Sequence, residues 1–294
     1  MNEGVYRILS ALSDGRTHAR SAVVRDAGEA QSVLLALEKD KPRWFDAHGA
    51  ELRLSEKGRK AHAFEQRART PALSEAELVD ALRARLDGRP AVKRELDQVF
   101  ATPETVARRA RRLVATGEAQ RGVLFLGDDD LTSLALRLLL EAAGLEDRRV
   151  RVLELDEELV AFLRERGVEA TRHDLREPIP KDLDGRFGCV FTDPPYAPEG
   201  FGLFLSRAVP ALKNDGRVWV CFGQSRRASE RGLHKQRLLA EIGLLVEEVV
   251  PDFSRYEGAE SIGARSALWV TRRTPMTRPL SYAGGELYTR RSPA

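Results

Sequence analysis

The sequence has 294 residues, of which 42% are hydrophobic, enough for a catalytic domain and a smaller second domain. The net charge of +3, from 48 basic and 45 acidic residues, does not indicate a dedicated nucleic-acid binder. The longest apolar stretches are strand-sized and the N-terminus is not that of a signal peptide, so we expect a cytoplasmic protein with no membrane partner. The charged fraction of 32%, with few Cys and Met, is compatible with a thermophile.

The two cysteines, Cys189 and Cys221, both lie in apolar, strand-like stretches. Because such positions are typical of buried side chains, we expect reduced thiols in the protein core. The His and Cys residues show no spacing that indicates zinc, so we expect no metal site.

The first 64 residues are predicted to form one small domain. Apolar residues recur at helical spacing in three segments, 3–13, 19–27 and 29–40. A hairpin follows between Trp44 and Leu54, with a turn at His48-Gly49. Three helices followed by a hairpin is the order of a winged helix, which predicts a DNA-binding module or, as we prefer, an interaction or dimerisation module. A homodimer is therefore expected, and nucleic-acid binding is not. A third hypothesis makes this winged helix a regulatory module.

Residues 65–120 are predicted to be a helical, charge-rich segment that links two domains and contributes to the substrate site. Arg69-Thr70-Pro71 marks a break near its start. Further along, Thr102 is expected to be an N-cap and Pro103 the first residue of a helix. Four arginines follow on that helix and are expected to form a solvated face: Arg108, Arg109, Arg111 and Arg112.

From residue 121 to residue 272, predicted strands alternate with predicted helices. The strands are expected at Gly122–Leu126, Val150–Leu155, Ala170–Arg172, Cys189–Thr192, Arg217–Phe222, Leu245–Val250 and Ser266–Thr271. The helices are expected near Thr132–Ala143, Glu157–Arg166, Gly200–Leu212 and Leu233–Ile242. Crossovers of this length predict an α/β fold with a Rossmann-like, doubly wound, mostly parallel sheet of the class I methyltransferase type. Residues 273–294 are predicted to be a flexible tail.

Three acids in a row follow the first strand of this domain. Gly127-Asp128-Asp129-Asp130 comes directly after apolar Val123–Leu126 and before a helical pattern. A turn at this position usually presents backbone N–H groups to an anionic group. Three carboxylates instead repel anions and attract cations. The sequence therefore predicts a nucleotide-like ligand whose other end is positively charged; the alternative is a charged surface turn.

Acids also end the next strands, and parallel strands bring such ends to one crevice. Glu154 and Asp156 end the second strand, where an acid pairs with ribose hydroxyls. Asp174 ends the third strand, where it could meet an adenine amino group. Asp193-Pro194-Pro195-Tyr196 ends the fourth as a stiff, extended wall against a substrate. The alternatives are a helix-start acid for Glu154 or Asp156 and a turn cap for Asp174.

The acids also bear on which S-adenosyl ligand fits. The carboxylate of S-adenosylmethionine would meet Asp128, Asp129 and Asp130, and like charges about 4 Å apart repel by roughly 4 kcal/mol at an effective dielectric near 20. Decarboxylated S-adenosylmethionine ends in a propylammonium, and a polyamine acceptor is also cationic. The acids therefore favour aminopropyl transfer. The alternative, suggested by Asp193-Pro194-Pro195-Tyr196, is an S-adenosylmethionine-dependent amino-methyltransferase acting on adenine in nucleic acid.

Five motifs occur in an order that resembles the branched-chain polyamine synthase family, the N(4)-bis(aminopropyl)spermidine synthases. They are Thr102–Thr105, Gly127–Ser133, Glu154–Glu157, Asp174–Pro178 and Thr192–Pro195. The resemblance spans essentially the whole chain, and Gly-Asp-Asp-Asp-Leu-Thr-Ser is its most specific motif. Two positions differ from some members: Glu154 stands where an Asp is expected, and Tyr196 stands where an acid can follow the prolines.

The resemblance implies an aminopropyltransferase that uses decarboxylated S-adenosylmethionine as co-substrate and releases methylthioadenosine. The acceptor would be the central secondary amine of spermidine or a related linear polyamine, and no metal or permanently bound cofactor is implied. The expected catalytic acids are Asp130, Asp193 and Asp129, with the first two nearest the reacting nitrogen. The expected donor-binding residues are Gly127, Asp128, Glu154, Asp156, Asp174 and Leu175. The expected acceptor-binding residues are Glu104, Asp128, Asp129, Pro195 and Tyr196.

Overall fold

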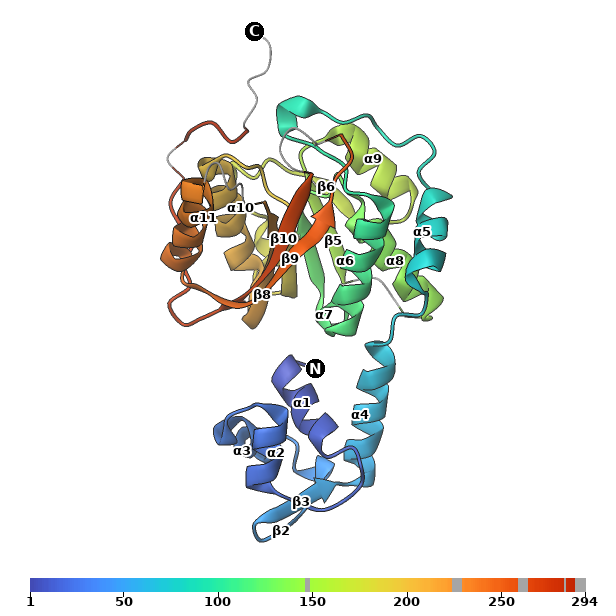
Figure 1. The fold of residues 1–294 in the computed structure, drawn as a ribbon, viewed down its shortest axis with the longest axis vertical. Helices are drawn as coiled ribbons and strands as arrows, with labels where there is room; N and C mark the ends of the chain where they lie inside the picture. The colour runs from blue at the N-terminus through green and yellow to red at the C-terminus, as the bar shows by residue number, and fades with distance from the viewer. Residues whose placement is uncertain (146–148, 224–228, 259–263, 283, 289–294) are drawn as a thin grey trace. The chain divides into compact units, whose positions relative to one another are not determined.

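The structure, a computed structural model, describes residues 1–145, 149–223, 229–258, 264–282 and 284–288 (Figure 1). It divides into two compact units, Met1–Pro71 with Val114–Gln120, and Ala72–Leu113 with Arg121–Ala294. The predicted domain limit at residue 64 falls inside the helix α4 (Glu56–Ala68), and the first unit continues to Pro71. The predicted 65–120 segment is divided between the units, so it is not a separate linker.

The first unit joins four helices to a small antiparallel sheet. Its helices are α1 (Glu3–Ala11), α2 (Arg20–Ala27), α3 (Gln31–Asp40) and α4. Its strands are β1 (His18–Ala19), β2 (Phe45–His48) and β3 (Glu51–Leu54), in the order β1-β3-β2. The three predicted helices and the hairpin are confirmed, and β1 and α4 are additional. Ile8, Leu34 and Leu54 are fully buried in the core that these elements share.

The second unit contains a seven-stranded sheet with the order β6-β5-β4-β7-β8-β10-β9. Its strands are β4 (Val123–Leu126), β5 (Val150–Glu154), β6 (Ala170–Arg172), β7 (Phe187–Thr192), β8 (Leu212–Phe222), β9 (Leu244–Arg255) and β10 (Arg265–Arg273). The first five strands in that order are parallel, and β10 pairs antiparallel with both β8 and β9. The prediction of a mostly parallel α/β sheet is confirmed.

Helices cover both faces of this sheet. They are α5 (Glu75–Arg83), α6 (Pro103–Ala115), α8 (Thr132–Ala142), α9 (Glu157–Glu165), α10 (Pro198–Ala211) and α11 (Ser229–Ile242); a short α7 (Glu118–Arg121) precedes β4. Figure 1 shows α5, α6, α8 and α9 on one side of the sheet and α10 and α11 on the other. The four predicted helices of this region are confirmed, with ends that differ by a few residues.

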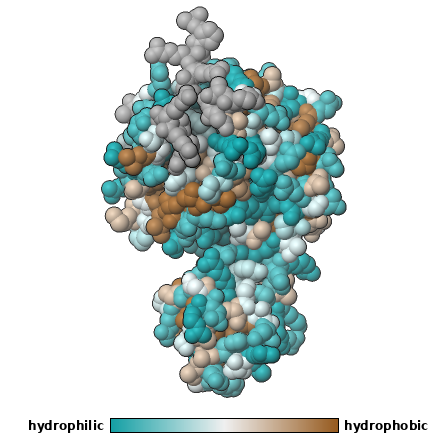
Figure 2. Space-filling view, in the orientation of Figure 1, coloured by the Kyte–Doolittle hydropathy of each residue, from teal (hydrophilic) through white to brown (hydrophobic). Residues whose placement is uncertain are grey.

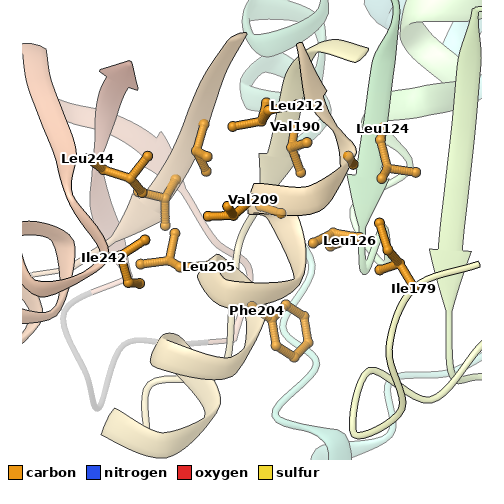
Figure 3. Close-up of a cluster of buried hydrophobic side chains, with 14 of the residues drawn as sticks. Leu124, Leu126, Ile179, Val190, Phe204, Leu205, Val209, Leu212, Ile242 and Leu244 are labelled. Carbon is orange, nitrogen blue, oxygen red and sulfur yellow. The ribbon is translucent and has the colours of Figure 1, made fainter. Parts of the chain in front are cut away.

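The parallel strands are buried because apolar helix faces pack on both sides of them. Every residue of β4 and of β7 is buried, as expected for strands covered on both faces. Figure 3 shows Phe204, Leu205 and Val209 of α10 in the same cluster as Leu126 of β4 and Val190 of β7. This packing fixes the strand ends from which the site is built.

The remaining expectations concern the cysteines, the tail and the membrane. Cys189 and Cys221 are both free and buried, as predicted. Within the predicted tail, Leu287 is buried and its carbonyl lies close to Gly200 of α10, whereas residues 283 and 289–294 lie outside the described residues. Across the described part of the chain, no helix has both the length and the apolar character needed to cross a membrane.

Candidate functional site

The strand order places the ends of four acid-bearing strands in a row. β6, β5, β4 and β7 are neighbours and parallel, so their carboxyl ends lie along one edge of the sheet. Asp174 follows β6, Glu154 ends β5, Asp129 and Asp130 follow β4, and Asp193 follows β7. Because neighbouring strands are about 4.8 Å apart, the row extends over roughly 15 Å. Acids that are distant in the sequence therefore line one crevice.

The turn after β4 directs its three carboxylates to different places. Gly127 and Leu131, with φ of +69° and +64°, are both in the left-handed region and bracket the acids. Asp128 turns back into the protein, where its carboxylate accepts hydrogen bonds from the backbone N–H (3.2 Å) and the hydroxyl of Ser133 in the first turn of α8. The next two acids face the crevice. A ligand in the crevice therefore meets two of the three.

The carboxylates of Asp129 and Asp130 are fixed by the segment that precedes α6. The N–H of Val99 donates to Asp129 at 3.2 Å, and the N–H of Ala101 donates to Asp130. The backbone carbonyl of Asp129 accepts a hydrogen bond from Arg89. Burial raises the pKa of the Asp129 carboxyl, and the neighbouring Asp130 raises it further. Asp129 is thus held in a place where its negative charge is costly without a cation.

A single buried guanidinium joins the acids of β4 and β7. Arg109 of α6 is completely buried, and its Nη1 donates to Asp130 at 2.5 Å while its Nη2 donates to Asp193 at 2.7 Å. Ser254 and Tyr256 complete the network: the Ser254 hydroxyl accepts from Arg109, and the Tyr256 hydroxyl donates to Asp193 at 2.5 Å. Burial raises the pKa of Asp193, and Arg109 opposes that rise. Asp130 and Asp193 are thus held by one guanidinium, and their expected place nearest the reacting nitrogen stays a prediction.

Glu154 is held at the end of β5 by two backbone N–H groups. One carboxylate oxygen accepts from Asp128 at 3.0 Å and the other from Asp156 at 2.9 Å. Burial raises the pKa of Glu154, while these hydrogen bonds oppose the rise. Each carboxylate oxygen can accept a further hydrogen bond, and Glu154 lines the crevice. The geometry is therefore suited to a pair of hydroxyl donors.

A cavity of about 180 Å³ follows this row of acids. Its charged lining consists of Asp97, Asp129, Asp130, Glu154, Asp174 and Asp193, with Arg94 and Arg265 as the basic members. Among the described residues, no group of three or more His, Cys, Asp or Glu side chains could hold a metal ion.

Four further predicted residues also line the cavity: Gly127, Leu175, Pro195 and Tyr196. The Tyr196 hydroxyl accepts a hydrogen bond from the N–H of Gly223 at 3.3 Å. Asp174 both lines the cavity and accepts from the N–H of Arg176 at 2.9 Å, so its alternative interpretation as a turn cap holds as well. These residues occupy the expected positions, and their roles stay predictions.

The family model described as the branched-chain polyamine synthase A C-terminal domain matches residues 77–281. The chain belongs to this family. Membership confirms the resemblance drawn from the five motifs, and the matched region contains the acids that end β4, β5, β6 and β7.

Individual relatives agree with this assignment. An uncharacterized protein of Methanocaldococcus jannaschii is 40% identical over 59% of this chain and 44% of its own length. The N(4)-bis(aminopropyl)spermidine synthase of Thermococcus kodakarensis is 33% identical over 62% of this chain and 53% of its own. The chain thus spans about half the length of these relatives. The crystal structure of the branched-chain polyamine synthase from Thermus thermophilus, in complex with N4-aminopropylspermidine and 5'-methylthioadenosine, has a TM-score of 0.60 at 26% identity, covering 97% of this chain and 91% of that one.

Two acids predicted to bind ligand act inside the protein framework instead. Asp128 accepts hydrogen bonds from Ser133 in the first turn of α8, as described above. Asp156 caps α9 through the N–H of Glu158 at 3.1 Å, and its carboxylate accepts from Lys93 at 2.6 Å and Gln98 at 3.2 Å. Both lie outside the lining of the cavity. The helix-start alternative is therefore correct for Asp156, because a short acid directly before a helix reaches its free N–H groups.

Glu104 is also outside the cavity, contrary to the prediction. Its side chain is half exposed and pairs with Arg83 of α5 at 2.7 Å. The hydrogen bond from the N–H of Thr105 to the hydroxyl of Thr102, at 3.3 Å, supports the other interpretation of this motif, a helix cap. Thr102–Thr105 therefore begins α6, and the helix then places Arg109 two turns further along.

The expectation of a solvated arginine face on α6 is wrong for Arg109. Val106, Ala110 and Leu113 are buried on this helix, and position 109 falls within the same helical stripe. That spacing is the signal by which the sequence could have identified Arg109 as buried. Other lining residues, Tyr256, Leu287 and Tyr288 among them, lie far from any recognised motif and carry no such signal.

Proposed function

We propose that this chain transfers aminopropyl groups from decarboxylated S-adenosylmethionine to the central secondary amine of spermidine or a related linear polyamine. The co-product is methylthioadenosine. The observation that carries the proposal is the row of acids along the carboxyl edge of β6, β5, β4 and β7, in a chain of this family. Each strand end would place a carboxylate beside a different part of the donor molecule.

The order of the strands suggests how the donor lies. Asp174, after β6, would meet the adenine, and Glu154, at the end of β5, would accept hydrogen bonds from the two ribose hydroxyls. His173 lines the same end of the cavity, and its Nε2 is buried without a hydrogen-bond partner among the described residues. The sulfonium and its propyl arm then reach the region between β4 and β7. That region is where Asp129, Asp130 and Asp193 converge.

The charges at this reacting end favour the decarboxylated donor. Of the three carboxylates there, those of Asp130 and Asp193 are ion-paired with the guanidinium of Arg109. A donor that ends in an ammonium adds a positive charge beside Asp129, whose pKa is raised by burial and by Asp130 and is lowered in part by Arg89. The carboxylate of S-adenosylmethionine would add a fourth negative charge. The same acids would hold the ammonium groups of a polyamine.

The reaction is a displacement at the propyl carbon bonded to sulfur. The lone pair of the acceptor nitrogen forms the new C–N bond, and the C–S electron pair returns to sulfur, which leaves as the neutral thioether of methylthioadenosine. The acceptor nitrogen must first lose a proton, and a carboxylate at the reacting end takes it. Asp193 fits this task because burial raises its pKa above that of an exposed carboxyl, and Arg109 and Tyr256 fix its orientation.

The ligands of the Thermus thermophilus enzyme support the proposal. Its crystal structure holds N4-aminopropylspermidine and 5'-methylthioadenosine, a branched product and a spent donor of the kinds proposed here. The curated relative from Thermococcus kodakarensis is named for the same chemistry.

Isothermal titration of the two donors tests the proposal at the site itself. Wild-type protein is expected to bind decarboxylated S-adenosylmethionine at least about tenfold more tightly than S-adenosylmethionine, since about 1.4 kcal/mol of charge repulsion suffices for that ratio. Asp129→Asn is expected to reduce the ratio of the two dissociation constants. Equal or tighter binding of S-adenosylmethionine would instead favour an amino-methyltransferase, which a methylation assay on adenine-containing nucleic acid would detect.

We further propose that the first unit is a winged helix and that the protein acts as a homodimer. The helices α1 to α3 followed by the β2–β3 hairpin support the first statement. The second rests on the sequence-based expectation that this unit is a dimerisation module.

A further inference from the structure

Arg89 lies in the chain that connects α5 to α6, residues 84–102, and belongs to none of the motifs recognised in the sequence. Hydrophilic side chains predominate on the face of the molecule that Figure 2 shows, and the nearby Arg85 and Asp87 are exposed. Arg89 instead turns inward: its Nε is buried and has no hydrogen-bond partner among the described residues. A buried, unpaired N–H group is costly, so neighbouring groups must compensate the burial of this guanidinium.

Arg89 contacts two pieces of the chain that hold the acids of the site. Its Nη2 donates to the backbone carbonyl of Asp129, on the turn after β4. Its guanidinium also lies 3.3 Å from the centre of the Phe100 ring, a cation–π contact. Phe100 stands between the two residues whose backbone N–H groups donate to the carboxylates of Asp129 and Asp130. Arg89 therefore links the turn that carries these acids to the segment that fixes their carboxylates.

Acidic side chains lie near the guanidinium of Arg89. Burial lowers the pKa of Arg89, and these acids oppose the change. In order of effect they are Asp130, Asp129, Asp128 and Glu257. Most of them belong to the turn after β4, so the charge of Arg89 is matched mainly by that turn.

The same attraction acts on Asp129. Burial raises the pKa of this carboxyl, and Asp130, Glu154 and Asp193 raise it further, whereas Arg89 lowers it. Arg89 is therefore the basic group with the largest effect on Asp129. The remaining charged groups of the site, which stay unchanged in the variants below, are Arg94, Asp97, Arg109, Asp174 and Arg265.

We propose that Arg89 is a positioning residue: it holds Asp129 in place and keeps its carboxylate ionised, so that Asp129 can bind an ammonium group of a substrate. Arg89 itself lies outside the cavity lining, so it acts through Asp129 and not on the substrate. This inference rests on the proposed function for the identity of the cation, whereas the effect of Arg89 on Asp129 can be measured without any ligand.

Arg166 of α9 provides a matched control on the same connecting chain. Its guanidinium lies 3.5 Å from the centre of the Phe162 ring and donates to the carbonyls of Arg85 and Asp87 at 2.7 and 2.5 Å. These are the kinds of contact that Arg89 makes, but the ion pair of Arg166 is with a neighbouring acid of α9, at 3.7 Å, and not with the crevice. A loss of ring stacking or of support for residues 84–102 would therefore appear in Arg166→Gln as well.

Carbon-13 NMR of protein labelled at the aspartate carboxyl carbons tests the effect of Arg89 without a ligand. The resonance that disappears in Asp129→Asn belongs to Asp129, and its titration midpoint is then measured in each variant. Arg89→Gln keeps a donor for the Asp129 carbonyl but loses the charge, so the midpoint is expected to rise by about 1 pH unit or more. Arg89→Lys keeps the charge, and its midpoint, like that of Arg166→Gln, is expected close to the wild-type value. An unchanged midpoint in Arg89→Gln, or an equal rise in Arg166→Gln, would overturn the inference.

Isothermal titration of the same proteins with decarboxylated S-adenosylmethionine at several pH values gives the second readout. The affinity of Arg89→Gln should begin to fall at a higher pH than that of the wild type, because a protonated Asp129 cannot pair with the ammonium group. Arg166→Gln should follow the wild type, and coincident curves for Arg89→Gln and the wild type would contradict the inference. A wild type that binds no donor, with the NMR midpoints as expected, would refute the proposed function while supporting the effect of Arg89 on Asp129.

Discussion

The guanidinium of Arg109 lies 2.7 Å from Asp193 and 2.5 Å from Asp130, while its side chain is completely buried. One cation from α6 thus fixes the spacing of two acids that belong to different strands. Neither acid can turn away without leaving a charge unpaired in the interior, which is costly. The site therefore depends on a residue that need not touch either substrate.

Replacing Arg109 by Met is expected to reduce both activity and stability. The loss of one partner of a buried ion pair costs about 3–5 kcal/mol, so the melting temperature should fall by several degrees. Transfer activity should fall by at least about 100-fold, because a mispositioned reacting group costs that much. Calorimetry and a steady-state transfer assay measure the two effects.

Arg108→Met is the matched control for this change. Arg108 is the preceding residue of the same helix, but it is half exposed, where it pairs with Glu75 at 3.5 Å and donates to the carbonyl of Phe253 at 3.1 Å. We expect activity within about twofold of wild type, because exposed pairs contribute about 0–1 kcal/mol. Equal losses of transfer activity in Arg109→Met and Arg108→Met would contradict the proposal that Arg109 positions the two acids.

Asp193→Asn is expected to separate donor binding from turnover. The amide keeps the shape of the carboxyl group but cannot accept the proton of the acceptor amine, so kcat should fall by about 10²–10⁴-fold. The Kd for decarboxylated S-adenosylmethionine, measured by titration, should change little. Near-normal turnover would remove Asp193 from the proposed role, and Asp130→Asn offers the same test for the acid that shares Arg109.

Glu154 and Asp156 provide a test of donor recognition by two neighbouring acids. Glu154→Gln should raise the Kd for the donor by about 10-fold or more, because weakened hydrogen bonds to the ribose cost about 1.5 kcal/mol or more. Asp156→Asn should leave donor affinity nearly unchanged and lower the melting temperature, since Asp156 caps α9 and pairs with Lys93. The opposite pattern would reverse the assignment of these two acids.

Lys235 is expected to give the stability of the second unit a pH dependence. Its ammonium lies 4.2 Å from the centre of the Tyr196 ring, and burial lowers its pKa to about 8 from an ordinary 10.5. Between these two values the unfolded chain binds a proton that the folded chain does not, so stability rises with pH. Lys235→Met removes that dependence and should raise the melting temperature at pH 7 by a few degrees.

Calorimetry at pH 7 and pH 9.5 checks this expectation. The advantage of the variant should shrink at the higher pH, where the wild-type lysine is mostly neutral in the folded protein. A wild type that is more stable than Lys235→Met at pH 7 would show that the contact with the aromatic rings outweighs burial of the charge.

Periodicity and strand-end position predicted the larger part of the fold. The strands β4 to β10 have strong apolar cores, and the crossovers between them permit few topologies. The positions of Glu154, Asp174 and Asp193 at one edge of the sheet could be predicted as well, because neighbouring parallel strands have their carboxyl ends at the same edge. The domain limit was misplaced because α4 continues the helical pattern through residue 64 without a break.

The direction of individual side chains could not be predicted in the same way. Asp128, Asp129 and Asp130 are identical in type and adjacent, yet only Asp128 accepts hydrogen bonds from Ser133 of α8, and the backbone between the acids and α8 is left-handed at Leu131. Leucine gives no signal of a positive φ, unlike glycine. Likewise, Tyr256 joins Asp193 through a contact 63 residues away in sequence, and local patterns do not contain that information.

Mass spectrometry of the products tests the central claim most directly. Purified protein is incubated with spermidine and either decarboxylated or ordinary S-adenosylmethionine, and tandem spectra locate each added group. The account predicts aminopropyl groups on the central nitrogen, with one methylthioadenosine released per group, and only with the decarboxylated donor. No aminopropylated product, or methyl transfer from the ordinary donor at a comparable rate, would contradict it.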